Sequence, residues 1–348
     1  MAALFSRHSL ALQTSYSEVK RQASEQPSAL IGTPGSVSVR EIKDNRFYYR
    51  QFYDAEGNKA AAYIGPVGDP AAERAARELR ARIEATNAIV KEVRLLAQNG
   101  YTRVDARTGA ILAAFSNNGL FRGGAVLVGS HAYGVLLNDL GVRAAAYGTE
   151  DIDLARGAPL ALEHPLAFEA VLAESTVQLS GVPGLDRKAP VTSYKARGKS
   201  ALRVDLLTPT SGRDVSTRAL PELKGHAAAL PHLAYLLTKP VESVALGREG
   251  AIPVRVPRPE AFVWHKALVS QARGATSEKK NKDVLQACVL FAVLAEDATD
   301  SLVDAFRELP GSAAKLVRRS AAAMRARLEA SGHTRATELL LALAKRRG

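Results

Sequence analysis

The chain has few of the residues that form disulfide bonds and membrane spans. It contains one cysteine, two methionines and one tryptophan among 348 residues. A lone cysteine, Cys288, allows no disulfide within the chain, which is typical of a reducing compartment. No apolar run approaches the roughly 18 residues of a membrane span. The N-terminal stretch also lacks an apolar segment followed by a small-residue cleavage site. We therefore expect a cytoplasmic protein without a signal peptide or membrane contact.

The composition is that of a globular protein with an excess of positive charge. Hydrophobic residues make up 47% and charged residues 24% of the chain, and the net charge is +12. Residues 310–348 contain nine Lys and Arg against two Glu, and so contribute +7 of that charge. Two interpretations stand. A basic tail favours a polyanionic partner such as RNA, or arginine is simply a solvated residue of Ala- and Arg-rich helices.

Apolar periodicity divides the chain into three expected parts. Residues 1–100 predict an N-terminal helix, a β-hairpin and a long helix. Residues 101–256 alternate strand and helix patterns, which indicates a core built on a mixed sheet. Residues 257–348 carry about five helical patterns, which predicts a C-terminal helical bundle. The expected fold class is therefore α/β (α+β).

The first part combines an aromatic hairpin with a stiff helix. Residues 38–64 predict a hairpin closed by Gly57-Asn58. This hairpin is either a half-buried face or a stacking surface for nucleic acid. Residues 70–98 predict a helix that starts at Pro70. The aromatic and basic residues of the hairpin are Phe47, Tyr48, Tyr49, Phe52, Tyr53, Arg46, Arg50 and Lys59. The expected apolar face of the helix consists of Leu79, Ile83, Val90, Val93 and Ala97.

An acidic pair follows a Gly-Ser turn in the second part. The apolar run 125–129 ends in Gly129-Ser130, a helical pattern follows, and Asp151-Ile-Asp153 comes next. Residues i and i+2 of a strand point to the same face, so the two carboxylates project together. Converging carboxylates are costly unless positive charge lies between them. Divalent cations bound with phosphate oxygens are the usual solution, and Mg²⁺ prefers oxygen ligands.

A third carboxylate lies in a later strand pattern. In the segment ALRVDLL, alternation places Val204 and Leu206 on one face and Asp205 on the other. The order of Gly-Ser, Asp-x-Asp and a distal strand with Asp resembles the polymerase-β-like nucleotidyltransferase superfamily. More closely, FRGGAVLVGSHAYGVLLNDLGVR, TEDIDLA and NRFYYRQFYDAEGNKAAAYIGP resemble a bacterial family of uncharacterised nucleotidyltransferase-fold proteins, over most of residues 38–290.

This resemblance implies a role for each motif residue. Gly129 and Ser130 would hold the triphosphate of a bound NTP such as ATP, because a glycine and a helix N-terminus allow backbone N–H groups to approach anionic oxygens. Asp151, Asp153 and Asp205 would ligate two Mg²⁺ ions, with Asp205 on the ion nearest the attacking hydroxyl. An NMP group would be transferred and pyrophosphate released. The connector between Ser130 and Asp151 is longer than in compact members of the superfamily, so they do not indicate the acceptor site.

A basic cluster follows in the helical part. Lys266 and Arg273 lie two helical turns apart and can share a face, and Lys280 and Lys282 stand at the start of the next helix pattern. Helical partners of such nucleotidyltransferases carry a similar pattern, which implies that these groups reach the nucleotide phosphates. The alternative is a solvated corner between two helices.

The expected activity is a Mg²⁺-dependent transfer of NMP from an NTP to a hydroxyl group. The basic tail and the aromatic hairpin favour RNA, for example a tRNA end, or a protein side chain as the acceptor. A small metabolite such as an antibiotic is the alternative acceptor. Two alternatives need no catalysis: a module that only binds nucleotide or nucleic acid, and a solvated strand edge with no site. The presence of all three aspartates favours the enzyme.

Overall fold

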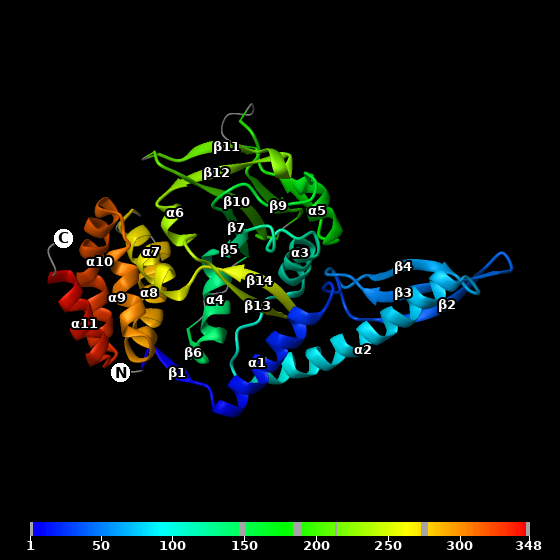
Figure 1. Ribbon diagram of the computed structural model, residues 1–348, viewed down its shortest axis with the longest axis horizontal. Coiled ribbons are helices and arrows are strands. Elements are labelled where there is room, and N and C mark those ends of the chain that lie inside the picture. Colours follow the sequence, from blue (N-terminus) through cyan, green and yellow to red (C-terminus); the bar gives the residue numbers. More distant parts are fainter. Residues whose placement is uncertain are drawn as a thin grey trace.

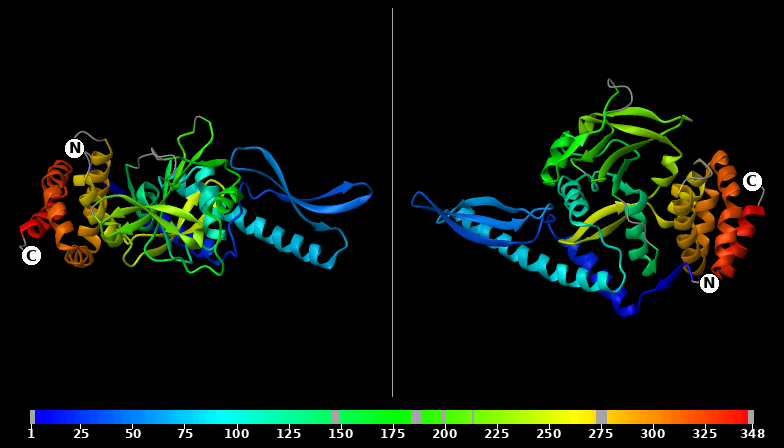
Figure 2. Two further views of the ribbon diagram at one scale, coloured as in Figure 1. Left: turned by 90° about the horizontal axis from the view of Figure 1, so that it is seen from above. Right: turned by 180° about the vertical axis from the view of Figure 1, so that it is seen from behind.

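The molecule is elongated, with a mixed sheet at its centre, helices at one end and a slender arm at the other (Figure 1). Both chain ends lie beside the C-terminal helices, and the arm projects from the opposite side in every view (Figure 2). No helix of the described residues is both long and apolar enough to cross a bilayer. The computed structural model describes residues 3–145, 150–183, 189–198, 200–212, 214–272 and 278–345.

Strands and helices alternate over residues 5–256, and the described elements from residue 259 onward are all helices, which confirms the α/β (α+β) class. The described strands are β1 (Phe5–Arg7), β2 (Ser36–Ile42), β3 (Asn45–Tyr53), β4 (Lys59–Pro66), β5 (Ala125–Val128), β6 (Val142–Ala144), β7 (Asp151–Arg156), β8 (Leu179–Gly181), β9 (Ser193–Ala196), β10 (Arg203–Thr210), β11 (Ser216–Leu220), β12 (Gly225–Pro231), β13 (Val241–Gly247) and β14 (Gly250–Val256). The described helices are α1 (Leu10–Glu25), α2 (Pro70–Gln98), α3 (Ala106–Asn117), α4 (Gly129–Asp139), α5 (Phe168–Glu174), the short 3₁₀ helix η1 (Pro221–Leu223), α6 (Leu233–Leu236), α7 (Pro259–Ala272), α8 (Glu278–Asp297), α9 (Thr299–Arg307), α10 (Gly311–Ala330) and α11 (Thr334–Lys345).

The central sheet is mixed and has β10 at its middle. Its main path runs β11-β12-β10-β7-β5, and β9 joins β10 to β8. Strand β10 is parallel to β7 and β12, whereas β5 and β9 are antiparallel to their neighbours. Alternation sets the faces, since Ile152, Val204 and Leu206 are buried between partly exposed neighbours. The parallel pairing of β7 with β10 brings the strand that carries Asp151 and Asp153 beside the strand that carries Asp205.

The C-terminal helices share one apolar core with this sheet. Trp264 of α7 is fully buried, and its Nε1–H donates a hydrogen bond to the carbonyl oxygen of Leu302 at 3.0 Å. Helix α8 is buried almost continuously from Val284 to Ala295. The N-terminal segment reaches these helices too, because the backbone N–H of Leu4 donates to Nε2 of His333 at 3.2 Å. The helices are therefore fastened to the body from two sides.

The arm consists of the meander β2-β3-β4 laid along α2 (Figures 1 and 2). The sequence predicted a single hairpin over 38–64, which is wrong in one respect. The segment before Phe47 folds back as β2 through a turn at Lys43 and Asp44, both with positive φ. The second turn, at 54–58, contains Gly57 with φ +85° and closes β3 onto β4 as expected.

Helix α2 has the predicted bounds and connects the arm to the body. Asp69 caps its first turn by accepting a hydrogen bond from the N–H of Ala72. The expected apolar face was partly wrong: Ile83 and Val93 are buried, but Leu79, Val90 and Ala97 are only half-buried. The observed stripe takes small residues where the sheet lies close, and large ones against the body. It consists of Ala72, Ala76, Ile83, Thr86, Ile89, Val93 and Leu96.

Candidate active site

Three aspartates lie together on β7 and β10. Asp153 and Asp205 are direct register partners on neighbouring parallel strands, so their Cα atoms lie roughly 5 Å apart. Asp151 precedes Asp153 by two residues and projects from the same face, opposite Arg203. All three are partly exposed, whereas the residues between them are buried. The structure thus brings together the three carboxylates that the sequence singled out.

Gly129 borders this group at the start of α4. Its φ is +70°, and a Cβ atom added there would lie 2.0 Å from Oδ2 of Asp153. Only glycine lets the carboxylate sit against the backbone at this point. Helix α4 starts here, and Val128 provides no side-chain cap. Gly129 and Ser130 therefore lie in a helix first turn, where N–H groups without intrahelical partners suit an anion.

The carboxylates are electrostatically strained by one another and by burial. Burial raises the pKa of Asp153 to about 7, and the neighbouring Asp205 and Asp151 raise it as well. Burial also raises the pKa of Asp205, although the hydrogen bond that Ser193 Oγ donates to its Oδ1 opposes this shift. Nε of Arg203 lies 3.6 Å from the same oxygen. A cluster of this kind favours a cation.

Lysines of the C-terminal helices supply positive charge to the site. Lys266 of α7 and Lys279 of α8 both lower the pKa of Asp153. Nζ of Lys266 forms an ion pair with Oδ1 of Asp283 at 2.8 Å and lies 5.3 Å from the ring centre of Phe262. Burial and the nearby Lys266 lower the pKa of Lys282. Helices α7 and α8 therefore place positive charge near the carboxylates of the site.

The structure describes three of the four residues of the predicted basic cluster, and their contact with nucleotide phosphates stays a prediction. Lys266 and Lys282 lie where they act on one another and on the aspartates. Lys280 is half-buried on α8, but the lysine that acts on Asp153 and Asp205 is its neighbour Lys279. One residue turns a helix by about 100°, so the two lysines point in different directions. Arg273 lies outside the described residues.

The donor set suits a hard cation shared with a ligand. Among the residues that the structure describes, no three His, Cys, Asp or Glu side chains converge into a ready-made metal cage. Mg²⁺ seldom needs one, because it usually binds one or two carboxylates together with substrate phosphates and waters. The adjacent pair of Asp153 and Asp205 fits that arrangement, and the ligand roles of all three aspartates stay predictions.

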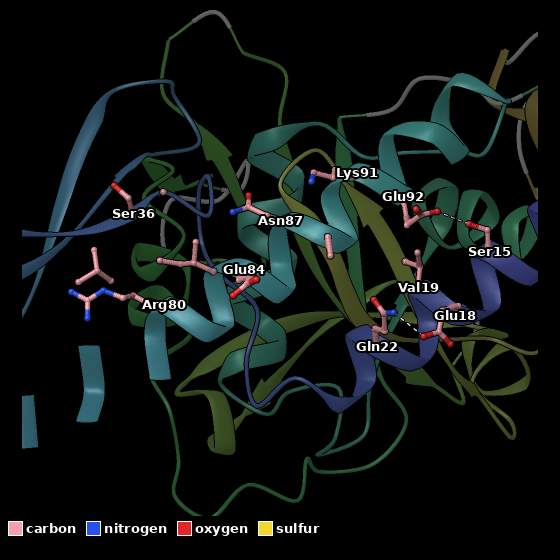
Figure 3. Close-up of a pocket in the computed structure, with 14 residues that line it drawn as sticks. Ser15, Glu18, Val19, Gln22, Ser36, Arg80, Glu84, Asn87, Lys91 and Glu92 are labelled. Carbon is pink, nitrogen blue, oxygen red and sulfur yellow. Dashed lines mark hydrogen bonds between the residues drawn. The ribbon is translucent and has the colours of Figure 1, made fainter. Parts of the chain in front are cut away.

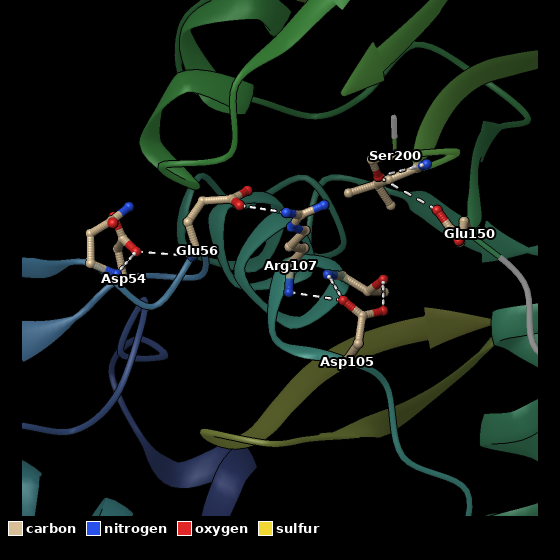
Figure 4. A network of polar contacts seen from close by, with 9 residues as sticks. Asp54, Glu56, Asp105, Arg107, Glu150 and Ser200 are labelled. Carbon is tan, nitrogen blue, oxygen red and sulfur yellow. Dashed lines mark hydrogen bonds and ion pairs between the residues drawn. The ribbon is translucent and has the colours of Figure 1, made fainter. Parts of the chain in front are cut away.

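His131 and α3 form the border of the site on the side of the arm. Burial lowers the pKa of His131 to about 4, Lys282 lowers it further, and Asp105 and Asp151 act in the opposite direction. Asp105 caps α3 by accepting hydrogen bonds from the N–H groups of Arg107 and Thr108. Figure 4 shows this cap and the ion pair beside it, which joins Arg107 to Glu56 in the second turn of the arm. The arm is thus anchored at the helix whose capping residue interacts with His131.

A groove elsewhere on the molecule contains none of the three aspartates. It lies between α1, α2 and β2 and has a volume of about 790 Å³ (Figure 3). Acidic and basic side chains mix along it, including Glu18, Arg80, Glu84 and Lys91. The candidate active site is therefore identified by its aspartates, Gly129 and lysines, and not by this groove.

The comparisons with known proteins agree with the geometry. Searches of curated proteins and of solved structures returned no match. A family model described as nucleotidyltransferase matches residues 106–310, which is more than half of the 348-residue chain. The matched range contains Gly129, Ser130 and the three aspartates of β7 and β10, together with α7 and α8. The chain belongs to this nucleotidyltransferase family.

Proposed function

We propose that the protein transfers an NMP group from an NTP, with Mg²⁺, to a hydroxyl group of RNA or of another acceptor and releases pyrophosphate. The observation that carries this proposal is the placement of Asp153 and Asp205 in register beside Gly129 at the start of α4. Membership of the nucleotidyltransferase family supports it. We further propose ATP as one usable NTP, a cytoplasmic location and a place within the bacterial nucleotidyltransferase-fold family named above.

The chain would hold the triphosphate between the start of α4 and the lysines of α7 and α8. Backbone N–H groups of Gly129 and Ser130 would donate to phosphate oxygens, and the glycine leaves room for them. Lys266, Lys279 and Lys282 would balance the phosphate charge from the opposite side. Asp283 fixes the ammonium group of Lys266 through its 2.8 Å ion pair. These groups would orient the α-phosphate toward the β7–β10 edge.

The aspartates would hold the metal and orient the acceptor. Asp153 and Asp205 are the proposed Mg²⁺ ligands, with Asp151 as a further one. When bound, the metal would neutralise phosphate charge and activate the acceptor hydroxyl. Ser193 and Arg203 restrain the carboxylate of Asp205, and this restraint fixes its direction before substrate binds. Such positioning supplies much of the rate in phosphoryl transfer.

A label-transfer experiment tests the proposal. The full chain is incubated with each NTP, labelled with ³²P at the α- or at the γ-phosphate, together with Mg²⁺ and total cellular RNA or protein, and the labelled product is then identified. Label from the α-phosphate should appear on an acceptor, label from the γ-phosphate should not, and Asp153→Asn should abolish the transfer. Glu41→Gln is the matched control, because it removes an exposed carboxylate from the arm. Transfer of the γ-phosphate, or full activity of Asp153→Asn, would contradict the proposed reaction.

A further inference from the structure

The meander of the arm has one covered face and one open face. Tyr48 of β3 packs against Ala72 and Ala76 of α2, and its hydroxyl donates to Glu73 at 3.0 Å. A Cβ atom on Gly65 would lie 2.5 Å from Cβ of Ala72, which shows how closely the helix approaches. Side chains alternate along a strand, so the neighbours of Tyr48 project to the other face. The structure has no element over that face among the residues it describes.

Aromatic side chains gather on the open face. Tyr49 and Tyr63 are register partners, and their ring centres lie 5.5 Å apart. Phe47 lies 5.9 Å from Tyr63 in the same way. Tyr63 is 58% exposed and Tyr53 is 47% exposed, although large aromatic side chains are usually buried in a stable fold. A contiguous exposed aromatic patch of this kind marks a binding surface.

The charge of the open face selects the partner. Arg40 is the register partner of Phe47, and its guanidinium lies 5.1 Å from the ring centre of Tyr49. Lys59 is the register partner of Tyr53 and shares the face. The acidic residues of the meander lie elsewhere: Glu41 projects to the other face, and the rest are in the two turns. Those turn residues are Asp44, Asp54 and Glu56. The strands thus present rings and cations on this face without a carboxylate.

We propose that the open face of the arm, formed by Phe47, Tyr49, Tyr63 and Arg40, binds single-stranded RNA by stacking its bases. Aromatic rings with adjacent cations are the chemistry that recognises unstacked bases and a phosphate backbone. RNA presents such bases in loops and at ends, where they are free to stack on aromatic side chains. The chain's net charge of +12 supports a polyanionic partner.

The anchor of the arm places this face on a path to the candidate active site. Glu56, in the turn that follows Tyr53, pairs with Arg107 at 2.5 Å. Arg107 lies in the first turn of α3, which Asp105 caps, and Asp105 acts electrostatically on His131 next to Ser130. An RNA bound on the arm would therefore lead toward the carboxylates. That the bound RNA supplies the acceptor hydroxyl rests on the proposed function, whereas the binding does not.

Binding is tested with the full chain and without NTP or metal. The probe is a fluorescein-labelled single-stranded RNA of about 12 nucleotides, within the site sizes known for such platforms, followed by fluorescence anisotropy. Stacking predicts that Tyr63→Leu weakens binding by about tenfold, whereas Tyr63→Phe, which keeps the ring, binds like the wild type. Because Tyr63 is exposed, both variants should unfold at the wild-type temperature, which shows that the fold is intact.

Two variants that each remove one positive charge distinguish binding at the open face from general electrostatic attraction between the protein and RNA. Arg40→Gln should weaken binding several-fold and reduce its salt dependence. Arg77→Gln removes the same charge from an exposed position of α2, the helix on the covered side, and should have a smaller effect. Asp153→Asn should bind RNA normally while losing label transfer. RNA binding by a wild-type chain that transfers no label would refute the proposed function alone.

Four results would overturn the RNA assignment. They are wild-type binding by Tyr63→Leu, equal losses in the Arg40 and Arg77 variants, tighter binding of DNA with the same sequence, and a wild-type dimer that Tyr63→Leu converts to a monomer. The last result would identify the face as a contact between two copies of the chain. Light scattering after size-exclusion chromatography distinguishes it from RNA binding.

Discussion

Removing Lys266 tests whether the C-terminal helices serve the site through charge or only through packing. Lys266→Met keeps the apolar stem but removes the ion pair that Lys266 forms with the carboxylate of Asp283. The side chain of Asp283 is buried at 3% exposure, and that of Lys266 is largely buried at 12%. Losing one partner of a buried pair typically costs about 3–5 kcal/mol. Asp283 also interacts with Lys282, so we expect the lower end, about 3 kcal/mol.

A double-mutant cycle isolates the contribution of the Lys266–Asp283 ion pair to the free energy of unfolding. Asp283→Asn in the Lys266→Met background removes the buried charge that has lost Lys266, and the double variant should recover about 2 kcal/mol of the free energy of unfolding. Urea unfolding followed by circular dichroism measures the four proteins. NTP binding, measured on the same samples, should stay weak in both Lys266 variants, because the charge that faces the phosphates is absent in each.

The cycle can fail in two distinguishable ways. If Lys266→Met is no less stable than the double variant, Asp283 does not depend on Lys266 and the buried-pair reasoning is wrong. If the double variant regains both stability and NTP affinity, Lys266 acts on the nucleotide only by holding Asp283. In that case α7 contributes a scaffold and not a ligand.

Three further changes have expected outcomes. Gly129→Ala should lower stability by about 1–3 kcal/mol, because its positive φ strains alanine. It should also slow label transfer by about 100-fold, since the new Cβ, 2.0 Å from Oδ2, must displace Asp153. Burial lowers the pKa of His131 to about 4, so the unfolded chain binds a proton near pH 6.5 that the folded protein does not. Stability should therefore fall by up to about 3 kcal/mol as the pH drops from 6.5 toward 4. Urea midpoints at pH 7 and 4.5 should show this loss in wild type and in a control at the exposed His164, His164→Asn, but less of it in His131→Asn. Trp264→Phe removes the hydrogen bond to a buried carbonyl and should cost about 1–3 kcal/mol in thermal unfolding; an unchanged melting temperature would show that the bond contributes nothing.

Local patterns in the sequence predicted the strands of the site well. Alternation alone put Asp153 and Asp205 on the exposed faces of their strands, and burial of Ile152 and Val204 confirms it. Periodicity could not show that the two strands are neighbours, because they lie some fifty residues apart in the chain. Resemblance to known nucleotidyltransferases supplied that step. The ligand roles and the division at residues 100 and 256 stay predictions.

The misses have local causes. The sequence did not predict strand β2, because its turn has Lys43 and Asp44 at positive φ, where glycine or asparagine is the usual signal. The sequence did not indicate Lys279 beside Lys280, because a run of charged residues does not show which of its side chains faces the core; the role of Lys280 stays a prediction. In the structure, Lys279 of α8 acts on Asp153 and Asp205 through its charge.

The uninterrupted course of α2 has a consequence for how an acceptor would be chosen. After Pro70 the helix has no proline or glycine over its remaining residues, so it lacks the usual cause of a kink. Its second half belongs to the core shared with α1, β13 and β14, while its first half carries the meander. With 29 residues it is roughly 43 Å long. The helix would thus fix the distance between the arm and the candidate site. An RNA held on the arm would reach the carboxylates only if its length matched that distance, whatever its sequence.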